Sequence, residues 1–352
     1  MQTITMNAMT KYEIMVGEGL LEKTGEIISK VSRSKRAVIV TDNIVGALYS
    51  ERVINSLKMS NISAETFVFQ NGEKSKSHEV LIKLYEFLTD MRITRSDLII
   101  ALGGGVVGDL TGFAAATYLR GMDVVQIPTT LLAQTDSAIG GKTAVNISNG
   151  KNLVGAFKQP LCVICDLSTI KTLSKEIFSD GMAEIIKYGM IRSESLFNTL
   201  AENPADMNLE QVIVECINIK KSVVEADEFD KGERMLLNFG HTIGHAIEKH
   251  YNFDGISHGQ AVAIGMCIMS DYTEKAKLTK KGTTEVLIKC LEKYGLPTKT
   301  DIPVSKLIGY CLNDKKRESE NINIIVCDDI GKSEIIKLSI KDFYKLMEVE
   351  NV

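Results

Sequence analysis

The sequence predicts two domains, an α/β domain built on a parallel sheet and then an all-α domain. Between Lys35 and Asp166, short runs rich in valine and isoleucine alternate with helix-length segments, which is typical of a parallel sheet covered by helices. After Leu167 strand signals nearly vanish, and apolar residues recur three and four positions apart. We therefore expect an α/β domain over residues 1–167 and a helical domain over residues 168–352.

Each predicted element follows from its residue pattern. The predicted strands are short and rich in β-branched residues: 37–41, 65–69, 98–102, 124–127 and 161–165. The predicted helices have apolar residues at helical spacing: 44–57, 78–91, 178–191, 209–226, 233–251, 258–278 and 283–294. Residues 322–327 and 334–338 are predicted to form a hairpin around the turn at 328–331, ahead of a last helix.

The composition indicates an ordinary globular protein of the cytoplasm. Of 352 residues, 44% are hydrophobic and 24% charged, which is enough to bury two cores. The net charge of -4 argues against a nucleic acid or an anionic membrane as the partner. The chain contains neither a long apolar run nor an N-terminal signal pattern. The odd number of cysteines, seven, indicates a reduced compartment, and Cys162 and Cys165 are expected to be core thiols.

A glycine-rich segment, residues 103–109, predicts a phosphate-binding turn. It follows the predicted strand 98–102 directly and precedes a helical pattern that continues to Ala116. Glycines in such a turn permit positive φ angles and a close approach of the backbone to a pyrophosphate at the helix N-terminus. The spacing of Gly103, Gly105 and Gly108 also fits the dinucleotide fingerprint, which indicates a Rossmann-like nucleotide-binding domain. The alternative is a tight structural turn.

No acidic residue ends a following strand about 20 positions after this fingerprint, where such a residue is usual. Two earlier acids near strand ends, Asp42 and Glu73, are the candidates for holding ribose hydroxyls instead.

A cluster of histidines predicts a metal site. Four of the five histidines in the chain lie within residues 241–258: His241, His245, His250 and His258. The first two are four residues apart on one predicted helix, so their rings face the same way. His250, at a predicted helix end, is expected to be structural.

A catalytic zinc commonly takes three protein ligands and keeps one position open. Glu184 is the candidate carboxylate, because it lies in an apolar helical segment where an unpaired acid would be costly. The alternative is that the histidines are core residues and that Glu184 forms a structural ion pair with Lys187.

Six cations lie beside glycines, small residues or apolar residues: Arg120, Lys142, Lys151, Lys187, Lys220 and Arg234. Converging cations of this kind would bind a small polyanion, because arginine forks a carboxylate or phosphate and lysine acts as a point charge. The alternative for each one alone is a solvated side chain.

Together these motifs resemble the 3-dehydroquinate synthase family, from about residue 41 to residue 316. The resemblance is carried by residues 71–76, 103–109, 118–121, 127–133, 136–146, 150–153, 181–189, 238–248 and 258–263. It implies the fold of that family, in which a Rossmann-like NAD-binding domain precedes an all-α domain that binds metal and substrate.

The resemblance also implies a role for each matching residue. The implied metal ligands are Glu184, His241 and His258, with zinc as the usual ion and cobalt as the alternative. The implied NAD contacts are Asp42, Glu73, Lys76, Gly104, Gly105, Asp109, Thr129 and Thr130, together with Lys142 and Lys151. The implied catalytic residues are His245, Lys142, Lys187, Lys220, Arg234 and Asn238. The implied substrate contacts are Asp136, Lys151, Asn152, Lys316 and Arg120, the last reaching a phosphate site across a homodimer interface.

The implied reaction converts 3-deoxy-D-arabino-heptulosonate 7-phosphate, a sugar-acid phosphate of the shikimate pathway, into 3-dehydroquinate and phosphate. NAD removes hydride from the C5 alcohol, the ketone acidifies the neighbouring C–H, phosphate leaves, and hydride returns before an aldol closure. The metal acts as a Lewis acid on the alkoxide and ketone. The alternatives are another sugar-phosphate cyclase, a metal-dependent polyol dehydrogenase that would release NADH, and a non-catalytic NAD-binding module.

Overall fold

A computed structural model describes residues 1–148, 150–202, 207–313 and 320–349 of the chain. The chain divides into two compact units, Met1–Ser174 with Lys220–Phe229, and Lys175–Ile219 with Asp230–Val352. None of the helices in the described ranges is both long enough and apolar enough to cross a membrane.

The first unit is built on a seven-stranded sheet of order β1-β2-β9-β6-β5-β3-β4. Its strands are β1 (Gln2–Asn7), β2 (Lys11–Gly17), β3 (Arg36–Asp42), β4 (Ser63–Phe69), β5 (Leu98–Gly103), β6 (Asp123–Pro128) and β9 (Cys162–Asp166). All neighbours pair in parallel except β1, which is antiparallel to β2. The prediction of a parallel sheet is therefore confirmed, whereas the N-terminal hairpin β1-β2 was not predicted.

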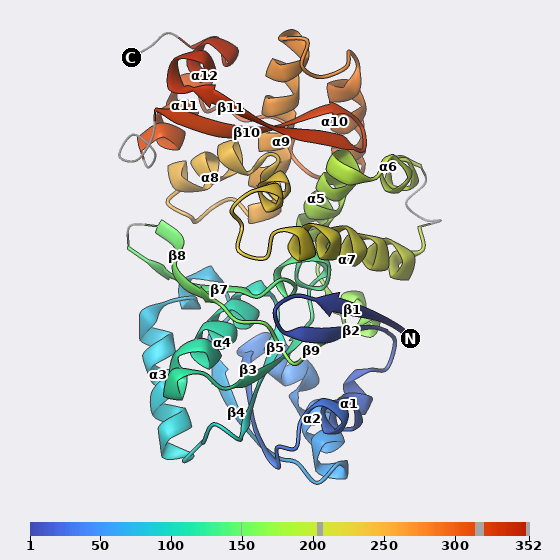
Figure 1. The fold of residues 1–352 in the computed structure, drawn as a ribbon, viewed down its shortest axis with the longest axis vertical. Coiled ribbons are helices and arrows are strands. Elements are labelled where there is room, and N and C mark those ends of the chain that lie inside the picture. The colour runs from blue at the N-terminus through green and yellow to red at the C-terminus, as the bar shows by residue number, and fades with distance from the viewer. Residues whose placement is uncertain (149, 203–206, 314–319, 350–352) are drawn as a thin grey trace. The chain divides into compact units, whose positions relative to one another are not determined.

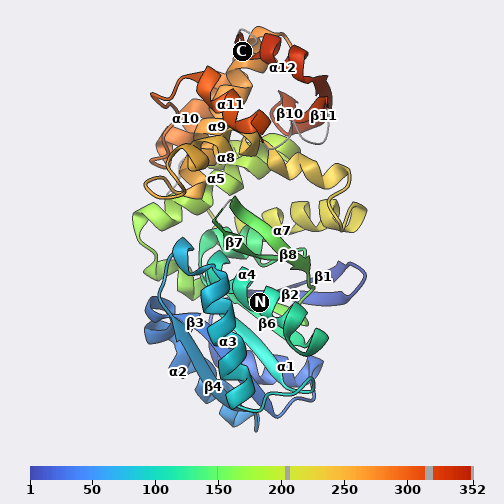
Figure 2. The same cartoon turned by 90° about the vertical axis from the view of Figure 1, so that its left-hand side faces the viewer.

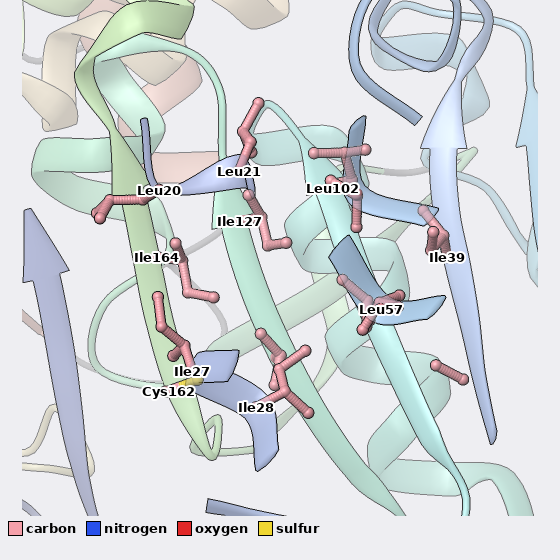
Figure 3. Packing of buried hydrophobic residues seen from close by; sticks show 14 of the residues in the cluster. Leu20, Leu21, Ile27, Ile28, Ile39, Leu57, Leu102, Ile127, Cys162 and Ile164 are labelled. Carbon is pink, nitrogen blue, oxygen red and sulfur yellow. The ribbon is translucent and has the colours of Figure 1, made fainter. Parts of the chain in front are cut away.

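Helices cover both faces of this sheet (Figures 1 and 2). They are α1 (Thr24–Val31), α2 (Asn43–Met59), α3 (His78–Asp90) and α4 (Gly105–Thr117). Alternate residues of β5 serve the two faces: Ile100 and Leu102 pack with α1 and α2, while Ile99 and Ala101 pack with α3 and α4. Figure 3 shows the first of these clusters. Because both faces are buried, the central strands consist of nearly continuous apolar residues.

Smaller elements connect the sheet to its surroundings. A hairpin of β7 (Lys142–Ile147) and β8 (Gly150–Phe157) lies outside the main sheet and was not predicted. A single π turn, η4 (Ala133–Ser137), follows β6. The short 3-10 helices of this unit are η1 (Leu21–Lys23), η2 (Glu73–Ser75), η3 (Tyr118–Arg120) and η5 (Leu167–Thr172).

The second unit is largely helical, as predicted. It contains α5 (Lys175–Arg192), α6 (Glu194–Ala201), most of α7 (Leu209–Ala226), η7 (Glu233–Asn238), α8 (His241–His250), α9 (His258–Lys275), α10 (Thr283–Lys293), α11 (Val304–Asn313) and α12 (Ile340–Leu346). The predicted late hairpin is present as β10 (Asn321–Asp329) and β11 (Lys332–Ser339).

All seven cysteines are free thiols, and six of them are buried. Burial raises the pKa of Cys162, on β9, and of Cys267, on α9, to about 12. It also raises the pKa of Cys165 and Cys327 well above the usual thiol range. The Cys162 and Cys165 pair is thus two protonated core thiols, as expected.

The prediction of one continuous helix over residues 233–251 is wrong. The structure has the 3-10 helix η7, a break, and then α8, whose N-cap Gly240 has φ of 78°. A Cβ at Gly240 would lie 2.5 Å from Met266 Cγ and 2.8 Å from the Val262 carbonyl oxygen. The close approach of α9 therefore requires glycine here and fixes the start of α8 at His241.

We predict that Gly240→Ala destabilises the protein more than Gly282→Ala, in metal-free samples. Both glycines are helix N-caps with positive φ, 78° and 96°, but a Cβ at Gly282 would meet nothing within 4 Å. Gly282→Ala should therefore cost only the backbone strain, about 1–2 kcal/mol. Gly240→Ala adds overpacking against α9, roughly 1–3 kcal/mol more. Urea unfolding measures both, and equal midpoints would contradict the steric argument.

Candidate functional site

The second unit contains a buried carboxylate with one oxygen unused. Glu184, in the buried middle of α5, is 1% exposed, and its Oε2 accepts a hydrogen bond from Lys187 Nζ one turn later. Its Oε1 has no hydrogen-bond partner among the described residues. This oxygen lies 3.5 Å from His241 Nε2 and 3.7 Å from His258 Nε2. A buried hydrogen-bond acceptor without a donor is rare in proteins, and a bound ion is one explanation for it.

The two imidazoles both turn the same nitrogen toward Glu184. His241 Nδ1 lies 3.2 Å from the Phe239 carbonyl oxygen, and His258 Nδ1 lies 3.5 Å from Glu248 Oε1. Carbonyl and carboxylate oxygens only accept hydrogen bonds, so each Nδ1 carries the proton and each Nε2 presents its lone pair.

With both rings neutral, as metal ligation requires, three electron-pair donors face one another. The ligand atoms of Glu184, His241 and His258 lie within 4.8 Å of one another. This donor set, two imidazole nitrogens and one carboxylate oxygen, is one that holds a divalent transition metal and leaves a coordination position open. The residues therefore fit a metal, and the orphaned Glu184 oxygen is the observation that tests the fit.

The electrostatics of the two histidines differ. Burial lowers the pKa of His241 well below its usual value, and the positive charge of Lys187 acts in the same direction. Burial also acts to lower the pKa of His258, but the hydrogen bond to Glu248 and the charge of Glu184 outweigh it, so that this pKa is raised.

The remaining histidines of the cluster separate into two cases. His245, one turn after His241 on α8, is exposed, and its ring centroid lies 5.5 Å from that of His241 and 6.2 Å from that of His258. His250 instead contacts the rings of Tyr251 and Tyr310, at centroid distances of 5.2 and 6.0 Å.

The other predicted site residues of this unit lie on η7, just before α8. Arg234 is buried, at 2% exposure, whereas Asn238 is exposed. Lys316 lies outside the residues that the structure describes.

In the first unit, the glycine-rich turn joins β5 to α4 as predicted, but the expected positive φ angles are wrong. Gly104 has φ of -75°, and none of the four motif glycines is among the positive-φ residues. Glycine is required for close packing instead: a Cβ at Gly103 would lie 2.5 Å from Val107, and one at Gly108 would lie 2.9 Å from Gln126 Oε1. Gly104 is the N-cap of α4 and has no side chain to accept hydrogen bonds from the first amides of the helix. These amides can therefore bind an anion instead.

Several predicted cofactor and substrate residues meet around Lys76. Its ammonium group, on a side chain that is 6% exposed, donates to Asp109 Oδ2 on α4 and to Asn152 Oδ1, the latter at 2.5 Å. Burial raises the pKa of Asp109, and the charge of Lys76 opposes this shift.

Asn146, which the sequence reasoning did not single out, extends this network. It donates from Nδ2 to Glu73 Oε1 at 2.8 Å, and its Oδ1 accepts from the Asn152 amide at 2.9 Å. Its own amide donates to the Lys76 carbonyl oxygen at 2.8 Å. One asparagine thus ties the β7-β8 hairpin to the loop that carries Glu73 and Lys76.

A second pair of predicted residues is brought together at the π turn. Lys220 Nζ donates to both the carbonyl oxygen and Oδ1 of Asp136, at 2.6 and 2.8 Å. The Lys220 side chain is 6% exposed, so this contact compensates a nearly buried charge.

The other predicted residues of the first unit differ in burial. Arg120, with φ of 66°, and Lys142 are exposed, and Lys151 is half-buried. Thr129 is buried, and Thr130 Oγ1 accepts from the Ala133 amide. Asp42 Oδ1 accepts from the amides of Ile44 and Val45 and thereby caps α2.

Glu248 is the other residue that the sequence reasoning missed. It is seven residues after His241, two helical turns on, and therefore lies on the same face of α8. The seven-residue spacing from His241 is the feature of the sequence that could have identified Glu248 as a residue near the metal ligands.

Comparison with known proteins identifies the family. Residues 66–180 match the model for the N-terminal part of 3-dehydroquinate synthase, and residues 181–317 match the model for its C-terminal part. The 3-dehydroquinate synthase of Clostridium kluyveri is 44% identical, over 100% of both chains. That of Clostridium perfringens strain 13 is 46% identical, over 97% of this chain and 100% of the relative.

A solved structure of another enzyme shares the fold. A 2-deoxy-scyllo-inosose synthase, complexed with carbaglucose-6-phosphate, NAD+ and Co2+, superposes with a TM-score of 0.85 at 26% identity, over 98% of this chain and 99% of the other. The chain therefore belongs to the 3-dehydroquinate synthase family and catalyses the reaction for which that family is named.

Proposed function

We propose that the chain forms 3-dehydroquinate as a carbon–oxygen lyase that uses NAD and a divalent metal, releasing phosphate from 3-deoxy-D-arabino-heptulosonate 7-phosphate. The observation that carries this proposal is the convergence of Glu184 Oε1 with the two imidazole nitrogens of His241 and His258. The solved relative bound to NAD+, Co2+ and a sugar-phosphate analogue supports the same combination of ligands.

The metal would be held by Glu184, His241 and His258, and we propose zinc as the usual ion, with cobalt as the alternative. Bound there, it would supply Lewis-acid polarisation of substrate oxygens. Lys187 has a defined part in this site: by donating to Oε2 it fixes the orientation of the carboxylate, with Oε1 toward the histidines. The low pKa of His241 keeps that ring neutral, as a ligand must be.

The first unit would hold NAD, which would supply a reversible hydride acceptor. The proposed contacts surround the N-terminus of α4 and the strand ends near it: Asp42, Glu73, Lys76, Gly104, Gly105, Asp109, Thr129, Thr130, Lys142 and Lys151. The uncapped first turn of α4 suits a pyrophosphate. The contact between Lys76 and Asp109 would keep both side chains in a fixed arrangement toward the cofactor.

The substrate is an anion, and the proposed contacts are mainly cations and amides. In the first unit they are Asp136, Lys142, Lys151, Asn152 and Lys220, and in the second Lys187, Arg234, Asn238 and His245, with Lys316 as a further contact. Asp136 would act by holding the ammonium group of Lys220 in position. His245, exposed one turn from His241, would move a proton or contact the phosphate.

We further propose a cytoplasmic homodimer in which Arg120 reaches a phosphate site of the partner. Its exposed side chain, on a backbone with φ of 66°, is consistent with a contact made outside its own chain.

We predict that Glu184→Ala, His241→Ala and His258→Ala each strip the metal and abolish turnover, because losing one of three ligands leaves an incomplete site. His250→Ala is the matched control, since this ring contacts two tyrosines instead. Elemental analysis after dialysis measures the metal. A Glu184→Ala protein with full metal content and turnover would remove the ligand assignment.

We predict that phosphate is released from 3-deoxy-D-arabino-heptulosonate 7-phosphate with only catalytic NAD. The hydride taken from the substrate is returned before the product leaves, so NADH absorbance should not rise in step with phosphate. Stoichiometric NADH beside product would instead favour a polyol dehydrogenase.

We predict that Lys142→Ala and Arg234→Ala weaken binding of a substrate-like phosphonate by about 10- to 100-fold, through loss of a charge-assisted hydrogen bond. Metal binding should stay nearly unchanged in both variants, and NAD binding should stay nearly unchanged in Arg234→Ala, because Arg234 is not among the proposed NAD contacts. Exposed lysines elsewhere in the two units, Lys83 and Lys289, provide control variants. Calorimetric titration with the phosphonate and with NAD separates the cases, and unchanged phosphonate affinity in both variants would overturn these substrate contacts.

A further inference from the structure

Glu248 is a buried acid on α8 that none of the roles above uses. It is 2% exposed, and its Oε1 lies 3.5 Å from Nδ1 of His258 on α9. Burying a carboxylate costs several kcal/mol unless it is hydrogen-bonded or paired. The acid therefore has to be understood through the group that it faces.

His258 has a carboxylate on each side. Its Nε2 faces Glu184 Oε1 at 3.7 Å, while its Nδ1 faces Glu248 Oε1 at 3.5 Å. The carboxylate on the Nδ1 side can only accept a hydrogen bond from the ring, so in the neutral ring it selects the tautomer whose lone pair is on Nε2, toward Glu184.

The corresponding support of His241 is a neutral backbone oxygen. His241 Nδ1 lies 3.2 Å from the Phe239 carbonyl, which side-chain substitution cannot remove. The two imidazoles are therefore supported differently, one by a carbonyl and one by an anion. An anionic partner makes the imidazole a more basic and stronger ligand.

Contacts at the N-terminus of α9 fix the backbone position of His258. His258 is the first residue of α9, whose N-cap Ser257 forms a reciprocal capping box with Gln260. The amide of Gly259 donates to Asp180 Oδ1 on α5 at 2.6 Å, and a Cβ at Gly259 would lie only 2.2 Å from the Asp180 carbonyl oxygen. The backbone of His258 is thus fixed, and the ring rotation is the freedom that Glu248 restricts.

We propose that Glu248 is a positioning residue for the metal site, which holds His258 in the Nδ1-protonated tautomer and strengthens its Nε2 as a ligand. This inference rests on the proposed function, because it requires Glu184, His241 and His258 to bind the metal. Glu248 itself would not contact the metal or the substrate.

The test measures metal affinity and the tautomer separately from turnover. Zn2+ affinity of Glu248→Ala, measured by competition with a chromophoric chelator, should fall by about 10- to 100-fold. Glu248→Gln keeps an acceptor oxygen but loses the charge, so its affinity should fall less. Long-range nitrogen–proton spectra of metal-free protein, recorded at alkaline pH where the ring is neutral, should show His258 protonated on Nδ1 in the parent, and a mixture of tautomers in Glu248→Ala.

Glu274→Gln is the matched control. This carboxylate lies on α9 as well and accepts from the amides of Gly282 and Thr284, so its loss weakens the fold away from the metal ligands. Its Zn2+ affinity should equal that of the parent. An equal loss in Glu274→Gln and Glu248→Gln would mean that general destabilisation is the cause, and would overturn the proposal.

The measured Zn2+ affinities distinguish failure of the role of Glu248 from failure of the metal site on which that role depends. Zn2+ affinity unchanged in Glu248→Ala or Glu248→Gln, while Glu184→Ala and His241→Ala lose the metal, would overturn only the role of Glu248. Unchanged affinity in Glu184→Ala and His241→Ala would overturn the metal site, and the positioning role with it.

Discussion

A charged carboxylate buried in the middle of α5 is the constraint on which the second unit depends. Glu184 is 1% exposed, and a buried ion is tolerated only when its partners are placed accurately. Lys187 satisfies one oxygen from within the same helix, where a spacing of three residues suffices. The other oxygen depends on tertiary structure, because its neighbours are histidines from α8 and α9. The acid therefore depends on the approach of these two helices, which apolar packing also holds together.

That approach explains the glycines of α8 and α9. A Cβ at Gly265 would lie 2.1 Å from the Gly240 carbonyl oxygen, and one at Gly244 would lie 3.2 Å from the Ala261 backbone. Helix backbones this close bring the first residues of both helices, His241 and His258, together, with ring centroids 5.2 Å apart. In the first unit, Gly103 at the end of β5 and Gly108 on α4 permit close contact with Val107 and Gln126, and polar contacts through Asn146 join the loops.

The elements and site residues that were predicted from the sequence are those that a local residue pattern determines. The central strands, buried on both faces, were found because their apolar runs are continuous, and the histidine cluster because its spacing is local. The hairpin β7-β8 was missed because β8 alternates between half-buried and exposed residues and resembles a loop. The break at Gly240 was missed because apolar periodicity continues across it, and its cause, the approach of Met266, is tertiary. Glu248 was missed for the same reason: an acid on a helix is ordinary until another helix buries it.

The protonated thiols of the core have a consequence for the choice of metal ligand. Thiolates bind zinc more strongly than imidazole and carboxylate oxygen do, but only the ionised form does so. Cys267 lies on the same helix as His258, but it is buried, and burial raises its pKa to about 12, so that without a metal it is a protonated thiol at neutral pH. Among the described residues, the groups placed to hold a metal contain no cysteine, so an ion bound there would meet only nitrogen and oxygen donors although the chain has seven thiols.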